Sequence, residues 1–130
     1  MRQNNRDVGF VSEAAFIYAA MKRGIQISRP MFDSAHFDLI ATNSNIHRIQ
    51  IKSTNTIIGD NTYRIATNYG ANSRKRYTEN EIEIIACHLI PIDTWYIVPV
   101  SKIITQTIRL YPNKLDNRFN KYKERWNLIT

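Results

Sequence analysis

Apolar residues at the spacing of an α-helix mark the first element of the chain, over residues 7–22. The positions that recur every three or four residues are Phe10, Ala14, Ile17 and Met21. Two basic residues followed by Gly24 end this pattern, as is typical of a helix C-terminus. We predict an amphipathic helix that packs through these four apolar side chains.

Two β-rich runs follow, over residues 37–42 and 46–53, with the polar residues 43–45 between them. Asn43 and Asn45 suit a tight turn, because asparagine tolerates a positive φ. The two runs therefore predict a β-hairpin directly after the first helix.

Further strands are predicted by later runs of apolar and β-branched residues, over residues 62–68, 81–89, 95–99 and 105–110. Pro91 and Asp93 favour a turn between the second and third of these runs, which we expect to form the middle of a sheet. We expect the last run to add an edge strand. Residues 69–76 are polar and basic without apolar periodicity, so they predict a mobile loop.

An apolar stripe closes the chain and predicts a C-terminal helix over residues 117–129. Its members are Phe119, Tyr122, Trp126 and Ile129. The chain of 130 residues contains no internal repeat or low-complexity linker, and its length is that of one domain with one core. The predicted fold class is α/β, a single domain over residues 1–130 with a central mixed β-sheet flanked by helices.

The net charge of the chain indicates a class of binding partner. The chain has 18 Lys and Arg against 11 Asp and Glu, a net charge of +7 and a pI near 9.8. This balance favours a polyanionic partner, nucleic acid, with an anionic membrane surface as the alternative. Because no apolar run approaches the roughly 20 residues that span a bilayer, and the N-terminus lacks a secretory signal, we expect a cytoplasmic protein. The single Cys87 excludes an internal disulfide and a cysteine-rich zinc site, and we interpret it as a small core residue.

The strand predicted over residues 46–53 contains Gln50 and Lys52, residue types that a buried strand rarely contains. Alternation along the strand sends Ile49 and Ile51 to one face, which we expect to be the core. Gln50 and Lys52 then project together from the other face, about 7 Å apart. A substrate could lie on that face.

Asp38 is a lone carboxylate between apolar neighbours, where a charge is costly unless a cation or hydrogen-bond donors compensate it. The predicted hairpin brings Asp38 beside Gln50 and Lys52. One acid, one amide and one ammonium group therefore converge, and Glu13 on the first helix is a candidate second carboxylate.

These residue types suit the hydrolysis of a phosphodiester with the help of Mg²⁺. Carboxylate and carbonyl oxygens are the ligands that Mg²⁺ prefers, and this ion uses only one or two protein carboxylates. The ion would polarise the phosphoryl oxygen and lower the pKa of a bound water, while Lys52 orients that water or stabilises developing charge. This chemistry needs no covalent nucleophile.

Three short motifs resemble those of the PD-(D/E)XK nuclease superfamily: residues 9–13, which read Gly-Phe-Val-Ser-Glu, then Phe37-Asp38, then Gln50-Ile51-Lys52. The later chain is similar to a compact subgroup that contains an intron-encoded homing endonuclease. This similarity is carried by Tyr77, the strand around Glu83, the run from Trp95 to Pro99, and Phe119, Tyr122 and Trp126. Two positions depart from the superfamily pattern, since Phe37 replaces a proline and Gln50 replaces an acid.

The resemblance implies a restriction-endonuclease-like domain and a DNA endonuclease that uses Mg²⁺, with Mn²⁺ as a substitute ion. It implies catalytic roles for Glu13, Asp38, Gln50 and Lys52. The implied metal ligands are Asp38, Gln50, the backbone carbonyl of Ile51, and Glu13. Because one such site cuts one strand, we expect a homodimer or homotetramer on double-stranded DNA.

A basic run next to an aromatic residue is a candidate nucleic-acid contact. Arg74, Lys75 and Arg76 are expected to bind phosphates, and Tyr77 is the candidate stacking aromatic. The alternative is a solvated loop, which is the common role of a short charge run.

The other candidate site residues have structural roles as alternatives to catalysis. Asp38 could accept backbone hydrogen bonds near a turn. Gln50 and Lys52 could form the solvated face of an edge strand. Glu13 could complement the helix dipole or form an exposed ion pair.

Alternatives also remain for the function. His36, His47 and His88 do not have the spacing of a metal site, so we interpret them as polar surface or satisfied core residues. A structure-selective nuclease, such as a Holliday junction resolvase, would read DNA shape rather than base edges. A non-catalytic DNA-binding module with the same fold is the alternative outside the enzymes.

Overall fold

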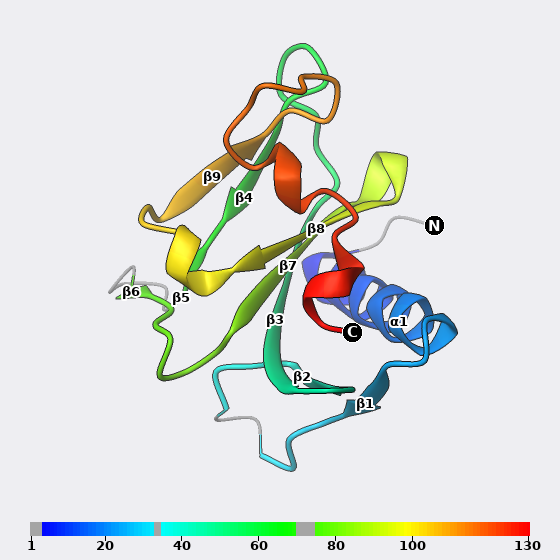
Figure 1. Ribbon diagram of the computed structural model, residues 1–130. Helices are drawn as coiled ribbons and strands as arrows, with labels where there is room; N and C mark the ends of the chain where they lie inside the picture. The colour runs from blue at the N-terminus through cyan, green and yellow to red at the C-terminus, as the bar shows by residue number, and fades with distance from the viewer. Residues whose placement is uncertain (1–3, 33–34, 70–74) are drawn as a thin grey trace.

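The computed structural model of the protein describes residues 4–32, 35–69 and 75–130. Within these residues the central sheet consists of β1 (Gln26–Ser28), β2 (Leu39–Thr42), β3 (Ile46–Thr54), β7 (Ile84–Leu89) and β8 (Thr94–Pro99). The strands lie in the order β1-β2-β3-β7-β8, with β3 and β7 parallel and the other neighbours antiparallel. Helix α1 (Asn5–Lys22) packs on one face of the sheet (Figure 1). The predicted α/β class with a central mixed sheet is confirmed.

Capping residues set both ends of α1. The side chain of Asn4 accepts a hydrogen bond from the backbone N–H of Asp7 over 2.9 Å, which satisfies one of the unpaired donors of the first turn. At the other end, Gly24 has a φ of 79°, a conformation that glycine adopts without strain. The predicted helix is therefore present, and it begins two residues earlier than the apolar pattern indicated.

Helix α1 packs through a different stripe from the predicted one. Its buried residues are Ser12, Phe16 and Ala20. Phe10 and Met21 are 56% and 62% exposed, and Ala14 is exposed as well. The prediction of the packing face was wrong for Phe10, Ala14 and Met21, whereas Ile17 is partly buried against the core. The helix packs on the sheet through Phe16 and the small residues Ser12 and Ala20, and hydrophobicity alone does not mark the small ones.

Phe16 anchors this stripe in an aromatic cluster. Its ring centroid lies 5.4 Å from that of Trp95 and 5.3 Å from that of Trp126. We expect Phe16→Leu to lower the free energy of unfolding by about 1–2 kcal/mol, since aromatic contacts contribute beyond the area they bury. The matched variant Phe10→Leu should change it by less than about 0.5 kcal/mol. Urea denaturation measures both, and equal losses would contradict the observed packing.

The hairpin and the strand beside it form the interior of the sheet. β2 and β3 are joined by residues 43–45, as predicted, with Leu39 paired to Ile49. On its other side β3 pairs with β7, from Ile49 opposite Ile84 to Thr54 opposite Leu89. All six residues of β7 are buried, as expected for an interior strand with both faces covered. β8 lies at the end of the sheet. The prediction that it lies in the middle was wrong.

Two short ribbons contribute to the side of the molecule opposite α1. β4 (Tyr63–Ala66) pairs with β9 (Thr107–Leu110), and their apolar residues join the core cluster that contains Ile85 and Cys87. The strand predicted over residues 105–110 thus pairs with β4 and is not an edge of the central sheet. β5 (Asn68–Tyr69) pairs with β6 (Lys75–Arg76), so both ends of the predicted loop are strand-paired. Residues 70–74 lie outside the described residues.

The C-terminal segment does not form the predicted helix over residues 117–129. It contains two 3-10 turns, η3 (Asn120–Tyr122) and η4 (Trp126–Leu128), and between them Glu124 has a φ of 53°. The N–H of Glu124 donates to the carbonyl oxygen of Trp95 over 2.7 Å, and the Trp95 N–H donates to the Glu124 carboxylate over 3.1 Å. Bonds to the edge of β8 replace the internal bonds of a helix.

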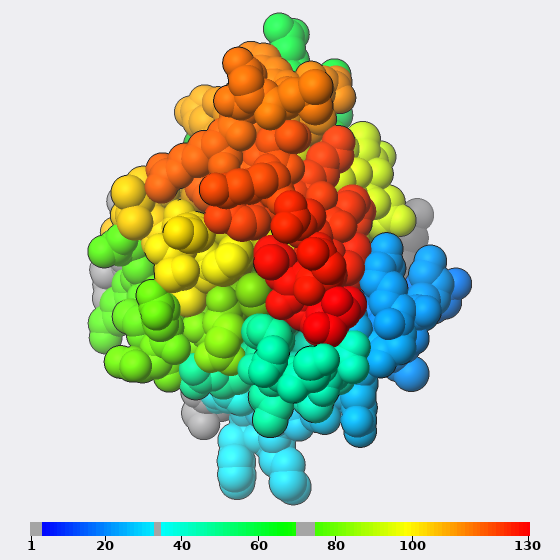
Figure 2. Space-filling view, viewed as in Figure 1, coloured from blue at the N-terminus to red at the C-terminus, as the bar shows by residue number. Residues whose placement is uncertain are grey.

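The apolar stripe of this segment is buried all the same. Phe119, Tyr122, Trp126 and Ile129 are all core residues. In the space-filling view the C-terminal residues (red) lie between α1 (blue) and the preceding segment (orange) (Figure 2). The segment therefore covers the sheet as predicted, without the predicted helix.

A buried histidine ties α1 to the sheet. His88 on β7 lies 2.8 Å from the Ser12 hydroxyl through Nδ1 and 2.8 Å from the Asp93 carboxylate through Nε2. Its ring stacks on Trp95 with centroids 4.1 Å apart. His88 is thus a satisfied core residue, and its bond to Ser12 fixes the helix turn that also carries Glu13.

Two interpretations drawn from composition can be compared with the structure. Cys87 is a free, fully buried thiol in β7, and burial raises its pKa to about 12. It is therefore the small core residue that the sequence indicated. Among the described residues, no helix is long and apolar enough to cross a membrane.

Candidate active site

Asp38 directly precedes β2 and lies beside β3, the strand that carries Gln50. Its backbone N–H donates over 2.8 Å to the carbonyl oxygen of Ile49, the residue that also pairs with Leu39. Its carboxylate oxygen Oδ2 accepts the backbone N–H of Ile51, also over 2.8 Å. The hairpin therefore brings Asp38 to the strand that carries Gln50 and Lys52, as the sequence predicted.

Gln50 and Lys52 project from the face of β3 opposite the α1 side. In the register of the sheet they lie beside Ile85 and Cys87, which belong to the second core cluster. Both side chains are half-buried, and β3 has a neighbour on each side. The solvated face of an edge strand is thus not their environment.

The Lys52 ammonium is held by two groups from the β5–β6 region. Its Nζ donates to the carbonyl oxygen of Asn68 over 3.2 Å and lies 5.4 Å from the centroid of the Tyr77 ring. Burial lowers the pKa of Lys52, an effect that the negative charge of Asp38 opposes. The result is a poorly hydrated cation next to a carboxylate.

Glu13 approaches the same place from α1. A cavity of about 250 Å³ is lined by Arg6, Gly9, Phe10, Glu13, Asp38, Gln50, Ile51 and Ser53. Glu13 also forms an ion pair with Arg29, with 2.8 Å between Oε1 and Nη1. The structure thus brings together around one cavity three of the four residues that the sequence singled out as catalytic, and Lys52 lies beside it near Asp38.

Burial dominates the electrostatics of the two carboxylates. It raises the pKa of Asp38 more than the Ile51 N–H and the Lys52 charge lower it. It also raises the pKa of Glu13, which Arg29 opposes and the charge of Asp38 reinforces. The ionised carboxylates are therefore incompletely compensated, and a cation between them would be bound favourably.

The oxygen donors around the cavity fit a hard divalent ion. No group of three or more His, Cys, Asp or Glu side chains at metal-binding spacing occurs among residues 4–32, 35–69 and 75–130. Mg²⁺ needs fewer, because it binds through one or two carboxylates and keeps several waters. The Gln50 amide nitrogen donates to the Ile51 carbonyl oxygen over 3.4 Å, so turning the amide would direct two oxygens to one cation.

Sequence reasoning missed two arginines at this site. Arg6 lines the cavity with Glu13, and Arg29 contacts Glu13 directly. A signal for Arg6 is present in the sequence, because Arg6, Phe10 and Glu13 have the four- and three-residue spacing of one helix face. Arg29 carries no such signal, since it reaches the site from the connection after β1.

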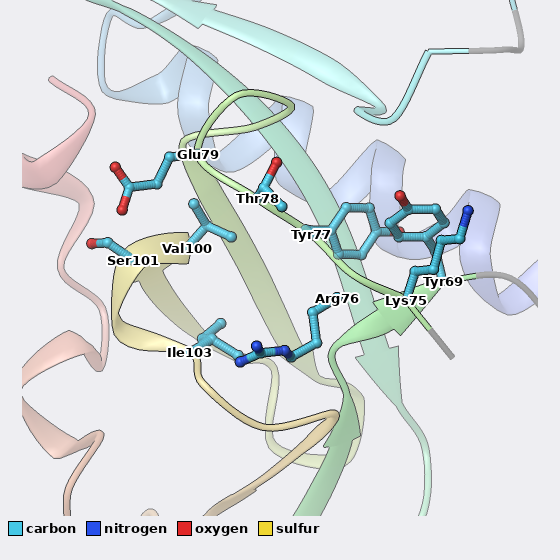
Figure 3. Close-up of a pocket in the computed structure, with 9 residues that line it drawn as sticks. All are labelled: Tyr69, Lys75, Arg76, Tyr77, Thr78, Glu79, Val100, Ser101 and Ile103. Atoms are coloured by element: carbon cyan, nitrogen blue, oxygen red, sulfur yellow. The ribbon is translucent and has the colours of Figure 1, made fainter. Parts of the chain in front are cut away.

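The basic residues of β6 lie beside a second, larger cavity. This cavity of about 560 Å³ is lined by Tyr69, Lys75, Arg76, Tyr77, Thr78, Glu79, Val100, Ser101 and Ile103 (Figure 3). Lys75 and Arg76 are exposed, and Arg76 donates to the carbonyl oxygen of Ile104 over 2.6 Å. Arg74 falls outside the described residues. The larger cavity borders Tyr77, whereas the smaller one borders Glu13 and Asp38.

Tyr77 lines this larger cavity and also lies close to Lys52. Its ring is buried, with its centroid 4.8 Å from that of Tyr69, and its other neighbour is the Lys52 ammonium. Burial and nearby negative charge raise the pKa of Tyr77 to about 12. The ring is therefore part of the environment of Lys52, and its contact with nucleic acid stays a prediction.

An ion pair holds β3 in register with β7 just before Gln50. The Glu83 carboxylate accepts the backbone N–H of Arg48 over 2.7 Å and pairs with the Arg48 guanidinium. The Glu83 N–H in turn donates to the Arg48 carbonyl oxygen over 3.1 Å. These bonds fix the strand from which Gln50 and Lys52 project.

This pair makes stability depend on pH. Burial tends to raise the pKa of Glu83, but hydrogen bonds from Arg48 and its charge hold that pKa below 4.5. An acid with a depressed pKa stabilises the fold above its unfolded pKa, and this contribution is lost as the pH falls through the folded value. We expect Glu83→Gln to cost about 1 kcal/mol at pH 7 and less at pH 3, measured by urea denaturation. An equal cost at both pH values would contradict this origin.

Known proteins with similar sequences or folds place this geometry in a family. Residues 3–129 match the family described as PD-(D/E)XK endonuclease. No curated protein sequence matches the chain. A bacterial homing endonuclease, I-Ssp6803I, has a similar structure, with a TM-score of 0.84 and 22% identity over 98% of this chain and 93% of that one. This likeness shows a shared fold, and the match over nearly the whole chain shows that the protein belongs to the PD-(D/E)XK endonuclease family.

Proposed function

We propose that this protein is a Mg²⁺-dependent endonuclease that hydrolyses phosphodiester bonds at specific sites in double-stranded DNA. The observation that supports this function is the convergence of Glu13, Asp38 and Gln50 on one cavity with Lys52 beside it. Membership of an endonuclease family gives the class of reaction. The oxygen donors around the cavity suit the ion.

The proposed ligands of the ion are Asp38 and Gln50, helped by Glu13 and the backbone carbonyl of Ile51. When bound, Mg²⁺ supplies an electrophile that polarises the phosphoryl oxygen and lowers the pKa of a bound water. Lys52 donates hydrogen bonds to the attacking water or to the phosphate as its charge develops. The Asn68 carbonyl and the Tyr77 ring hold its ammonium in place for this task.

The DNA is proposed to lie across the cavity that borders Glu13, Asp38 and Gln50, and to extend towards β6. Lys75 and Arg76 are exposed cations on that ribbon and suit phosphate contacts, and Arg74 precedes them in the sequence. The net charge of +7 favours the same partner. Site specificity of the homing or restriction type is supported by the fold shared with a homing endonuclease.

A single site formed by Glu13, Asp38, Gln50 and Lys52 would act on one strand at a time. Cleavage of both strands therefore requires two copies, and a two-fold symmetric assembly would match a pseudo-palindromic target. We propose a homodimer or homotetramer, which sedimentation of the protein with and without DNA would distinguish.

The experiment that tests the function uses the purified protein with supercoiled plasmid and a pool of duplex and branched DNA. Cleavage is expected with Mg²⁺ or Mn²⁺ and is expected to be absent with EDTA. Preference for one duplex sequence would support the site-specific reading. Preference for branched DNA would instead favour a structure-selective nuclease, and metal-independent DNA binding without any cleavage would favour a non-catalytic module.

A further inference from the structure

Arg29 is a cation that the structure places directly on a proposed metal ligand. Its Nη1 lies 2.8 Å from Glu13 Oε1. Arg29, Glu13 and Asp38 also line one cavity of about 220 Å³, on the side where Phe32 and Phe37 lie. The two carboxylates thus border two cavities, one with Gln50 and Ile51 and the other with Arg29.

The two partners of this ion pair differ in exposure. The Arg29 side chain is 61% exposed, whereas that of Glu13 is 18% exposed. Glu13 is held on α1, while the guanidinium reaches inward from the solvent side. Rotation of the Arg29 side chain would release it without disturbing the helix.

The backbone at Arg29 is nevertheless fixed. Arg29 follows β1, whose last residue Ser28 pairs with Ile40 of β2, two residues from Asp38. Pro30 comes next, and a residue before proline is restricted to extended conformations. The guanidinium of Arg29 can therefore move, while its backbone stays next to β2, the strand that follows Asp38.

Arg29 and a divalent cation compete for the same carboxylate. An ion that takes an oxygen of Glu13 repels the guanidinium and removes its partner. Among the described residues the structure shows no second acidic partner for Arg29. A DNA phosphate lying over the cavity would supply one, and the planar fork of arginine suits phosphate oxygens.

We propose that Arg29 exchanges partners in the catalytic cycle. It neutralises Glu13 until a divalent cation takes over that carboxylate, and it then binds a phosphate next to the scissile bond. The exchange rests on the proposed function, since it needs both the ion and the DNA. It has two consequences: Arg29 weakens metal binding by the free protein, and it strengthens DNA binding only when the metal is present.

The first consequence is measured by calorimetric titration of Mg²⁺ and Ca²⁺ into the DNA-free protein. Arg29→Gln is expected to bind both ions about two- to fivefold more tightly, the range set by loss of one exposed ion pair. Lys22→Gln is the matched control, because it removes the same charge from α1 about 13 Å along the helix from Glu13. It should change the affinity much less.

The second consequence is measured through the salt dependence of DNA binding. In Ca²⁺, Arg29→Gln is expected to reduce the slope of log K against log salt concentration by about 0.9, the loss of one phosphate contact. In EDTA the slopes of wild type and variant should coincide, since Arg29 then stays on Glu13. Arg29→Lys should keep the wild-type slope in Ca²⁺.

Three results would overturn the exchange. Equal slopes in Ca²⁺, or the same slope difference in Ca²⁺ and EDTA, would show that Arg29 does not change partners with the metal. Unchanged or weaker metal binding by Arg29→Gln would show that Arg29 only holds the connection after β1. Failure of the wild type to bind either ion would refute the proposed function itself, so the two failures are distinguishable.

Discussion

Asp38→Asn is expected to slow DNA cleavage by about 10³-fold or more, which corresponds to about 4 kcal/mol of lost electrostatic stabilisation by the metal. The asparagine oxygen can still accept the Ile51 N–H, so the local backbone is preserved. What is removed is the negative charge of the carboxylate. Single-turnover cleavage of plasmid DNA measures the rate, and calorimetry measures the accompanying loss of Mg²⁺ binding.

The same substitution is expected to raise thermal stability. Burial raises the pKa of Asp38, despite the opposing Ile51 N–H and Lys52 charge. Because the folded pKa lies above the unfolded value, the ionised carboxylate costs stability at neutral pH, and the cost disappears as the pH falls below the folded pKa. Asp38→Asn should therefore melt at a higher temperature at pH 7. A lower melting temperature together with lost activity would indicate misfolding instead of loss of a ligand.

Lys52→Met is expected to slow cleavage by about 10²–10⁴-fold, the range for removing a group that acts on the transferred proton or developing charge. Unlike Asp38→Asn, it should leave Mg²⁺ binding intact or tighter, because it removes a cation from the neighbourhood of Asp38. The methionine keeps most of the apolar stem that packs beneath the ammonium. DNA binding should change by less than threefold, since only one partly buried charge is lost.

The control for this variant is Lys22→Met, which removes a lysine from the exposed end of α1 and should cleave at the wild-type rate. Burial lowers the pKa of Lys52, so its charged form costs stability at pH 7 and the methionine should not reduce the melting temperature. If Lys52→Met cleaves DNA at the wild-type rate, Lys52 has no part in the mechanism. The carboxylates would then have to account for the catalysis.

The hairpin and the convergence of Asp38 with Gln50 and Lys52 could be predicted from the sequence because they depend on short-range rules. Strand alternation assigns each side chain to a face, and a short turn sets which residues lie opposite one another. Only 14 positions separate Asp38 from Lys52 in the chain. The pairing of Leu39 with Ile49 in the structure follows from the same turn.

Contacts between distant segments could not be predicted in this way. The face of α1 depends on Trp95 and Trp126, which come from the second half of the chain and accommodate Phe16. The C-terminal stripe has helical spacing, yet bonds between Glu124 and the edge of β8 gave a different backbone. In both cases a tertiary contact outweighed local periodicity.

Arg29 illustrates the same limit at the site. Its sequence neighbours are β1 and Pro30, and neither predicts an ion pair with a residue on α1. The acids and the lysine were found because their residue types stand out on a strand or helix. Charged residues are common in connections between elements, so the residue type of Arg29 does not indicate a role.

The parallel pairing of β3 with β7 also determines when the site is completed during synthesis. Glu13, Asp38, Gln50 and Lys52 all lie in the first 52 residues, yet the strand that carries two of them pairs with residues 84–89. At roughly 5–20 residues per second, the ribosome needs several seconds to add that second strand. Until then β3 has an unpaired edge, which is open to pairing with other chains. The strand pairing that supports the proposed site therefore forms late in translation.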